Sequence, residues 1–295
     1  MEAYVLTCCS TADMDKEFFL DRQIPYVSFH FTIDGETYPD DLGESYSLSQ
    51  FYDQIKKGSK PTTSQVNIVE YCEFFEPILK QGKNILHVTL SSGISGTYNS
   101  ACAAASEMRT KYPDKKIVVL DSLGASSGYG LLIDAIANFR DQGLGLEETA
   151  EWVLNKRLTV HHWFFSADLS SFKRGGRISA TSAMLGTVLN ICPLMTINDS
   201  GQLVLKQKIR TKHKAIREMV KQMELHADHG ENYDGPCFIS HSAAVDDARE
   251  VSALIEDRFP HLKGNIVIHE IGTVIGSHTG PGTVALFFFG DVRGE

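Results

Sequence analysis

The first half of the chain alternates short apolar runs with segments that have the periodicity of amphipathic helices. The apolar runs predict strands at residues 4–9, 24–31, 85–90 and 116–121. The periodic segments predict helices at residues 47–57, 66–80, 97–109, 126–139 and 147–156. Asp34-Gly35 between two strand-like runs predicts a hairpin. Strands that alternate with helices form βαβ units, so this half is expected to build a doubly wound, mainly parallel sheet.

The second half contains more strands and fewer helices. Strands are expected at residues 160–167, 194–197, 203–206, 236–240, 266–271 and 283–289, and helices at residues 212–226 and 246–258. Asn198-Asp199-Ser200-Gly201 predicts a second hairpin. The length favours two domains, which we place at residues 1–157 (α/β) and 158–295 (α+β).

Composition and charge exclude several classes of protein. Hydrophobic residues make up 42% and charged residues 22%, as in ordinary globular proteins. The net charge of -9 argues against general nucleic-acid binding, because phosphate backbones repel an acidic protein. Residues 1–22 lack the basic region of a signal peptide, and the apolar run at 284–289 is too short to cross a bilayer. We therefore expect a cytoplasmic protein with no membrane insertion.

The cysteines lack the Cys-x-x-Cys spacing of zinc and redox sites. We expect buried free thiols, and a redox pair formed by Cys8 and Cys9 is the alternative. The six are Cys8, Cys9, Cys72, Cys102, Cys192 and Cys237. The histidines also show no metal-ligand spacing, so neither a metal nor another cofactor is expected.

Three loops carry groups that could bind an anion. Gly93-Ile94-Ser95-Gly96-Thr97 follows a strand and opens a helix, where backbone N–H groups favour negative charge. The loop lacks the Gly-Lys-Ser/Thr of nucleotide sites, and a plain helix cap is the alternative. Thr62-Thr63-Ser64 precedes another helix, and a capping box would also explain it. His278 lies in a loop rich in glycine, Gly276 to Gly282, although a lone loop histidine is often only a surface residue.

Other polar residues give weaker indications. No serine lies in a Gly-x-Ser-x-Gly motif or a Ser/His/Asp order, and Asp121 and Asp168 fit turn or cap positions. Residues 169–198 contain no acid, while Lys173, Arg174 and Arg177 gather on a Gly-Gly turn. Such a cluster on an acidic protein can attract an acidic or phosphate-bearing partner, or it can be a solvated turn.

Five of these segments, in this order, resemble the DegV family over almost the whole chain. One departure is Cys9, where the family usually has an aspartate. The segments are Ser10-Thr11-Ala12-Asp13, the Pro-Thr-Thr-Ser-Gln loop at 61–65, Ser-Ser-Gly-Ile-Ser-Gly-Thr-Tyr at 91–98, Phe-Lys-Arg-Gly-Gly-Arg-Ile at 172–178 and Gly-Ser-His-Thr-Gly-Pro-Gly at 276–282.

The resemblance implies a two-domain α/β protein that holds a long-chain fatty acid in a cleft between its domains. Family members are the fatty-acid-binding subunit of bacterial fatty acid kinase, and a separate ATP-binding subunit phosphorylates the bound carboxylate for phospholipid synthesis. The implied carboxylate ligands are Thr63, Ser95, Gly96 and His278, with Ser10, Thr62 and Thr97 as further pocket residues. Lys173, Arg174 and Arg177 would belong to the kinase-docking surface.

Physical chemistry agrees with this role. A carboxylate taken out of water needs hydrogen-bond donors, and hydroxyls, a helix N-terminus and an imidazole supply them. The missing nucleotide motif fits a phosphate donor held by another protein. Two alternatives remain: a stand-alone small-molecule hydrolase or transferase that uses the Ser95/His278 region, and a regulatory scaffold with an incidental pocket.

Overall fold

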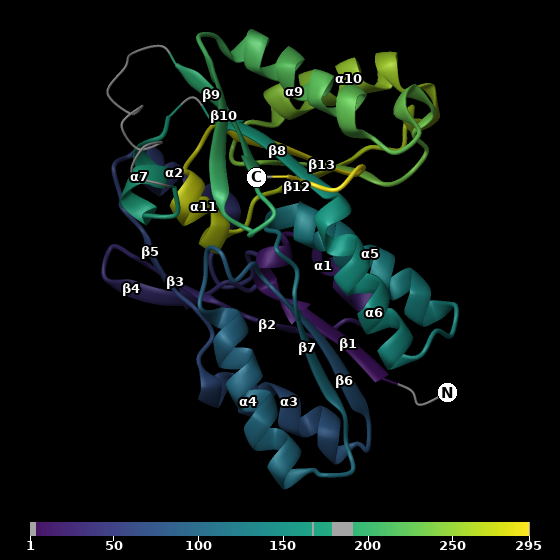
Figure 1. Ribbon diagram of the computed structural model, residues 1–295. Coiled ribbons are helices and arrows are strands. Elements are labelled where there is room, and N and C mark those ends of the chain that lie inside the picture. The colour runs from purple at the N-terminus through teal and green to yellow at the C-terminus, as the bar shows by residue number, and fades with distance from the viewer. Residues whose placement is uncertain (1–3, 167, 179–190, 295) are drawn as a thin grey trace.

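The protein is described from a computed structural model, which covers residues 4–166, 168–178 and 191–294. Its first layer is a four-stranded parallel sheet in the order β2-β1-β6-β7. The strands are β1 (Tyr4–Cys9), β2 (Tyr26–Val27), β6 (Asn84–Thr89) and β7 (Ile117–Asp121). The surrounding helices are α1 (Lys16–Asp21), α3 (Ile68–Lys80), α4 (Thr97–Lys111), α5 (Ser126–Asp141) and α6 (Leu146–Lys156). Helices α3 and α4 cover one face and α5 and α6 the other (Figure 1), as expected for a doubly wound sheet.

A six-stranded mixed sheet forms the second layer, in the order β10-β9-β8-β13-β11-β12. Its strands are β8 (Val160–Ser166), β9 (Cys192–Ile197), β10 (Leu203–Ile209), β11 (Cys237–His241), β12 (Val267–Glu270) and β13 (Thr283–Phe289). Only β11 and β12 pair in parallel. Helices α9 (Lys212–His226) and α10 (Val245–Arg258) cover its outer face, while α5 packs on the inner face (Figure 1). Both sheets therefore pack against α5.

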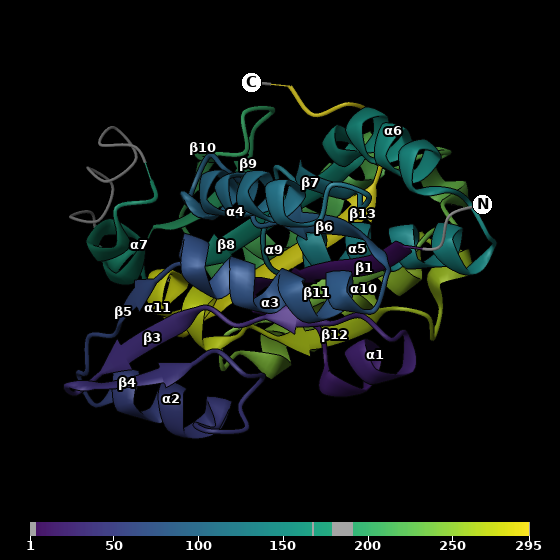
Figure 2. The same ribbon diagram turned by 90° about the horizontal axis from the view of Figure 1, so that it is seen from below.

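A small antiparallel sheet, β4-β3-β5, extends from the side of these layers. It consists of β3 (His30–Ile33), β4 (Glu36–Pro39) and β5 (Thr62–Ser64). Helix α2 (Leu48–Lys56) packs on it, and α11 (Thr273–Thr279) contacts both β3 and β5. Both views place α7 (Ser170–Gly175), α11 and β5 together at one edge (Figures 1 and 2). Segments more than 200 residues apart in sequence meet there, as the Thr63–His278 contact shows.

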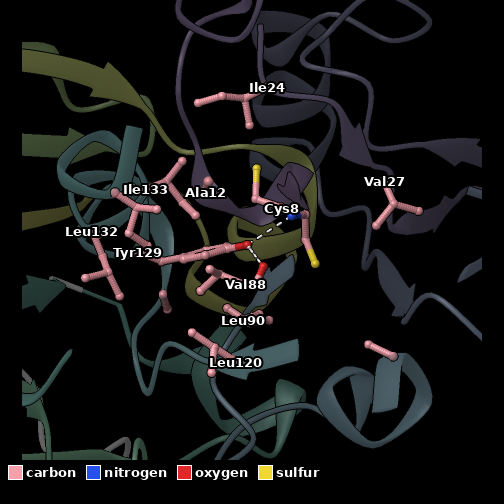
Figure 3. Close-up of a cluster of buried hydrophobic side chains, with 14 of the residues drawn as sticks. Cys8, Ala12, Ile24, Val27, Val88, Leu90, Leu120, Tyr129, Leu132 and Ile133 are labelled. Carbon is pink, nitrogen blue, oxygen red and sulfur yellow. Dashed lines mark hydrogen bonds between the residues drawn. The ribbon is translucent and has the colours of Figure 1, made fainter. Parts of the chain in front are cut away.

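The core of the first layer is built around a buried tyrosine. Tyr129 of α5 is fully buried, and its hydroxyl accepts a hydrogen bond from the Cys9 backbone N–H at 3.0 Å. The same hydroxyl donates to the Val88 carbonyl, so it joins two neighbouring strands (Figure 3). Apolar side chains such as Leu90 and Ile133 surround the ring. The buried polar group is thus satisfied inside an apolar core.

Four predicted segments differ from the structure. The predicted turn at residues 173–177 begins inside a helix, because Lys173 and Arg174 belong to the last turn of α7 and only Gly176 adopts a left-handed conformation. Residues 24–31 do not form one strand, because β2 joins the parallel sheet and β3 the small sheet. The break follows Val27, where the Phe29 N–H donates to Ser10 Oγ. The predicted loop at 61–65 contains strand β5, which pairs with β3. The predicted loop at 276–282 is mostly helix α11, whose first turn is held by contacts from remote residues that local sequence does not reveal.

Both predicted hairpins are confirmed, at Asp34-Gly35 between β3 and β4 and at 198–201 between β9 and β10. The division at residue 157 falls between α6 and β8, and one continuous apolar cluster includes residues from both sides of it. The two-domain boundary therefore remains a prediction. Among the helices that the structure describes, none combines the length and the apolar composition needed to span a bilayer.

Candidate functional site

A cavity of about 390 Å³ lies between the two large sheets. Its size falls in the range of about 300–1,000 Å³ that small-molecule sites occupy. Residues beyond the carboxyl ends of the parallel strands form one wall, namely Phe29, Leu90, Ile94, Ala125 and Ser126. This is the edge at which open α/β sheets bind ligands.

The opposite wall is the inner face of the second sheet. His162 and Phe164 of β8 line the cavity together with Thr283, Ala285 and Phe287 of β13. These positions alternate along each strand, and the intervening side chains pack beneath α9 and α10 instead. Further apolar groups come from Phe172, Ile197, Leu203, Ile271, Val274 and Ile275. The cavity is thus mainly apolar.

Polar groups gather at one end of the cavity. Thr63 Oγ1 lies 2.8 Å from His278 Nε2, and both residues line the cavity with Ser95. Ser95 Oγ donates to Gln65 Oε1 over a long 3.4 Å and also accepts from the Thr97 N–H. The Thr63 hydroxyl and the His278 imidazole bond to each other, and the Ser95 hydroxyl can give its proton to a ligand instead of Gln65 while it still accepts from the Thr97 N–H. The arrangement can donate hydrogen bonds to an anionic head group.

The His278 imidazole is held neutral at this end. Burial, followed by the charges of Arg177 and Arg174, lowers the pKa of His278 to about 4. Its buried Nδ1 has no hydrogen-bond partner among the described residues. A Cβ at Gly175 would lie 2.4 Å from that nitrogen, so only glycine lets the backbone of α7 approach the ring so closely. Gly175 therefore allows α7 to pack directly against the His278 ring.

Four of the expected pocket residues do not line the cavity. Thr97 is fully buried and its hydroxyl lies 2.7 Å from the Tyr71 hydroxyl in the core. Ser10 accepts from the Phe29 N–H. Thr62 faces solvent on β5, and Gly96 is the exposed cap of α4. The cavity lining therefore does not include these four residues, and their roles in binding remain predictions.

The basic cluster divides into one residue that lines the cavity and two that do not. Arg177 lines it, with Nε donating to the Ile94 carbonyl at 3.3 Å. Lys173 and Arg174 are exposed at the end of α7. Part of the acid-free stretch, residues 179–190, lies outside the described residues.

Cys9, the departure from the family pattern, is not a cavity residue. Its fully buried thiol lies 3.4 Å from the Tyr71 hydroxyl, and burial raises the pKa of Cys9 to about 11. Burial raises the pKa of Cys8 as well. Both remain thiols near neutral pH, whereas redox exchange requires a thiolate. These environments argue against the redox-pair alternative.

Two buried carboxyls hold the helix that carries His278. Asp40 Oδ1 accepts from the Thr273 N–H at 3.2 Å and from its hydroxyl at 2.6 Å. Asp13 Oδ1 accepts from the Gly272 N–H at 3.1 Å, and Oδ2 accepts from Ser126 Oγ. These contacts tie the start of α11 to the first half of the chain. Sequence reasoning missed both acids as site-positioning residues, because nothing local links them to residues 272–273.

Asp13→Asn is expected to become more stable relative to the parent protein as the pH rises. Burial raises the pKa of Asp13 well above its usual value, so the parent loses stability as pH rises through the folded-state pKa. In the unfolded chain the Asp13 carboxyl loses its proton at a lower pH than in the folded protein. Asn has no such proton, so the variant lacks this pH dependence. The difference in free energy of unfolding should therefore grow by up to about 1.4 kcal/mol per pH unit. Urea unfolding of both proteins between about pH 5 and 7 measures it.

Glu147→Gln provides the control for this measurement. A hydrogen bond from Lys116 lowers the pKa of Glu147, so its titration lies below that pH range, and a lysine partner keeps its proton throughout the range. The difference for this variant should therefore stay flat. An equally flat difference for Asp13→Asn would show that Asp13 is ionised in the folded protein.

Comparison with known proteins agrees with this fold. A family model described as "Uncharacterised protein, DegV family" matches residues 7–291. A DegV domain-containing protein of Clostridium perfringens is 36% identical over 293 residues, covering 99% of both chains. A Thermus thermophilus structure with the description "Fatty Acid Binding of a DegV family Protein" has a TM-score of 0.86 at 25% identity, over 99% of this chain and 100% of that one. DegV of Bacillus subtilis, described as a fatty acid binding protein, has a TM-score of 0.83 at 26% identity with the same coverage.

The fold and the cavity define a two-sheet α/β protein with an internal apolar cavity that is polar at one end. The chain belongs to the DegV family. This confirms the family predicted from the sequence motifs.

Proposed function

We propose that this protein binds one long-chain fatty acid, with the acyl chain in the cavity and the carboxylate at Thr63, Ser95 and His278. The observation that carries the proposal is the polarity of the cavity, whose lining is mainly apolar but includes the cluster of Thr63, Ser95 and His278. Burying each CH2 contributes about 0.8 kcal/mol, so a chain of about 16 carbons gains roughly 10 kcal/mol before costs. The descriptions of the Thermus and Bacillus proteins as fatty acid binding support the same ligand class.

We further propose that the protein is a non-catalytic subunit, which presents the carboxylate to a separate ATP-dependent kinase subunit in the cytoplasm. The product would be an acyl phosphate for phospholipid synthesis. The free thiols of all six cysteines support a reducing compartment. The site geometry also favours binding over hydrolysis, because His278 Nε2 faces Thr63 while Ser95 Oγ faces Gln65. A serine nucleophile needs its base within hydrogen-bond reach.

Mass spectrometry of lipid extracted from the purified protein tests this function. The expected result is about one long-chain fatty acid per chain, with no turnover of acyl or phosphoryl substrates by the protein alone. Turnover without a partner would support the hydrolase alternative. A lipid-free protein that takes up no added fatty acid would leave the scaffold alternative.

Arg174→Ala is expected to lower acyl-phosphate formation by the kinase subunit and to leave most of the fatty-acid affinity intact. The side chain is exposed outside the cavity, beside Lys173 at the end of α7. Fatty-acid titration and an assay with the kinase subunit and ATP measure the two effects. Arg249→Ala, at an exposed site on α10, is the control that should change neither. Loss of lipid binding in Arg174→Ala would contradict the docking role.

A further inference from the structure

Two histidines and an aspartate converge on the outer face of the second sheet. The groups are His161 of β8, His226 at the end of α9, and Asp291 just after β13. One ligand atom from each lies within 4.8 Å of the other two. Asp291 Oδ1 is 3.0 Å from His161 Nε2 and 3.1 Å from His226 Nδ1. The same His161 Nε2 also lies 3.0 Å from the Asp291 carbonyl oxygen, a contact that a bound ion would replace. None of the three lines the fatty-acid cavity.

The backbone fixes these three residues together. The Asp291 N–H donates to the His226 carbonyl at 3.0 Å, and Ala227 and Gly290 form an antiparallel bridge beside it. His161 points away from the cavity because its neighbour His162 faces into it. The site is therefore assembled by the pairing of the chain after α9 with the chain after β13.

Aromatic packing holds both imidazoles in place. The His161 ring stacks on Phe288, with centroids 5.0 Å apart and planes 5° apart. His226 stacks on His161 at 4.9 Å and on Trp163 at 5.9 Å. The His161 side chain is only 4% exposed, whereas that of Asp291 is 62% exposed. One side of the cluster is therefore rigid and buried, and the other is open to water.

The chemistry of the three donors matches a divalent transition-metal ion. Two imidazole nitrogens and one carboxylate oxygen, with water in a fourth position, form a common tetrahedral zinc ligand set. Ligands about 2.0–2.1 Å from such an ion lie roughly 3.3 Å from each other, close to the two distances seen here.

We propose that His161, His226 and Asp291 form a binding site for Zn²⁺ or a similar divalent transition-metal ion. Binding at His161 Nε2 places the ring proton on Nδ1. The indole N–H of Trp163, which now donates to Nδ1 over 3.4 Å, then faces a second N–H donor, so this contact must open. Zn²⁺ binding should therefore change the fluorescence of Trp163. The spacing rules applied to the sequence could not find this site, because His226 and Asp291 are 65 residues apart and His161 and Asp291 are 130 apart.

Zn²⁺ titration of the full-length protein against a chromophoric chelator tests the site. The expected result is saturable binding of one ion per chain, with a change in tryptophan fluorescence at the same stoichiometry. His226→Gln and Asp291→Asn should each weaken binding by at least about tenfold. His261→Gln, at an exposed histidine outside the cluster, is the control and should bind like the parent. Equal affinity in all four proteins would overturn the proposal.

Co²⁺ provides a second measurement on the unaltered protein, in case a variant does not fold. The proposal predicts visible absorption of tetrahedral Co²⁺ that Zn²⁺ removes. A Co²⁺ spectrum typical of the hexaaqua ion at saturating protein would overturn it. Fatty-acid affinity is expected to be unchanged by either ion, so this test is independent of the proposed function.

Discussion

Ala285→Trp is expected to reduce affinity for a long-chain fatty acid by about 100-fold or more. Ala285 lies in the middle of β13, and its side chain faces the cavity between those of Thr283 and Phe287. An indole at this position fills space that the proposed acyl chain needs. Displacing about four CH2 groups at about 0.8 kcal/mol each removes roughly 3 kcal/mol of binding free energy. Titration with a fatty acid of about 16 carbons measures the loss.

Two controls separate blockage of the cavity from misfolding. A short-chain acid that does not reach Ala285 should bind Ala285→Trp and the parent equally. Leu225→Trp adds the same ring at an exposed position on α9 and should leave all affinities unchanged. Since overpacking costs about 1–3 kcal/mol in a filled core, retention of the unfolding midpoint would also show that the ring enters space that is empty without ligand. Full affinity for the long chain in Ala285→Trp would place the acyl chain elsewhere.

Thr63→Ala and Ser95→Ala are each expected to weaken fatty-acid binding by about 1–3 kcal/mol, or roughly 5- to 150-fold. Each change removes a hydroxyl from the polar end of the cavity and leaves the bound carboxylate one donor short. The effect of Thr63→Ala also includes the loss of the His278 Nε2 contact, which fixes the ring. Calorimetry with one fatty acid at fixed pH measures both variants.

Thr62→Ala is the matched control, because Thr62 precedes Thr63 on β5 but faces solvent. Its affinity should equal that of the parent. If Thr62→Ala lost as much affinity as Thr63→Ala, the effect would come from β5 as a whole and not from the hydroxyl that lines the cavity.

The regular part of the fold was accessible from sequence because its signals are local. The apolar runs at residues 4–9 and 85–90 and the intervening helices correspond to β1, β6 and the helices around them. Asp34-Gly35 forms a hairpin because both residues adopt the positive φ angles that such a turn needs. Helix α11 was missed since its first turn depends on Asp40, which is 233 residues away.

The candidate site was only partly accessible for the same reason. Thr63, Ser95 and His278 lie in motifs that stand out by composition, and all three line the cavity. Gln65 and Gly175 contribute through contacts across the fold, which a single sequence does not reveal. The apolar wall of the cavity consists of alternate residues of β8 and β13. Both faces of these strands are buried, so both consist mainly of apolar residues. The sequence alone therefore does not show which face lines the cavity.

Comparing the affinities of a fatty acid and its methyl ester for the delipidated protein tests the central claim most directly. The two ligands share one acyl chain, but the ester has no carboxylate to accept hydrogen bonds from Thr63, Ser95 and His278. The account predicts that the acid binds at least about tenfold more tightly, and that this preference shrinks in Ser95→Ala. Equal affinities of acid and ester in the parent protein would contradict it.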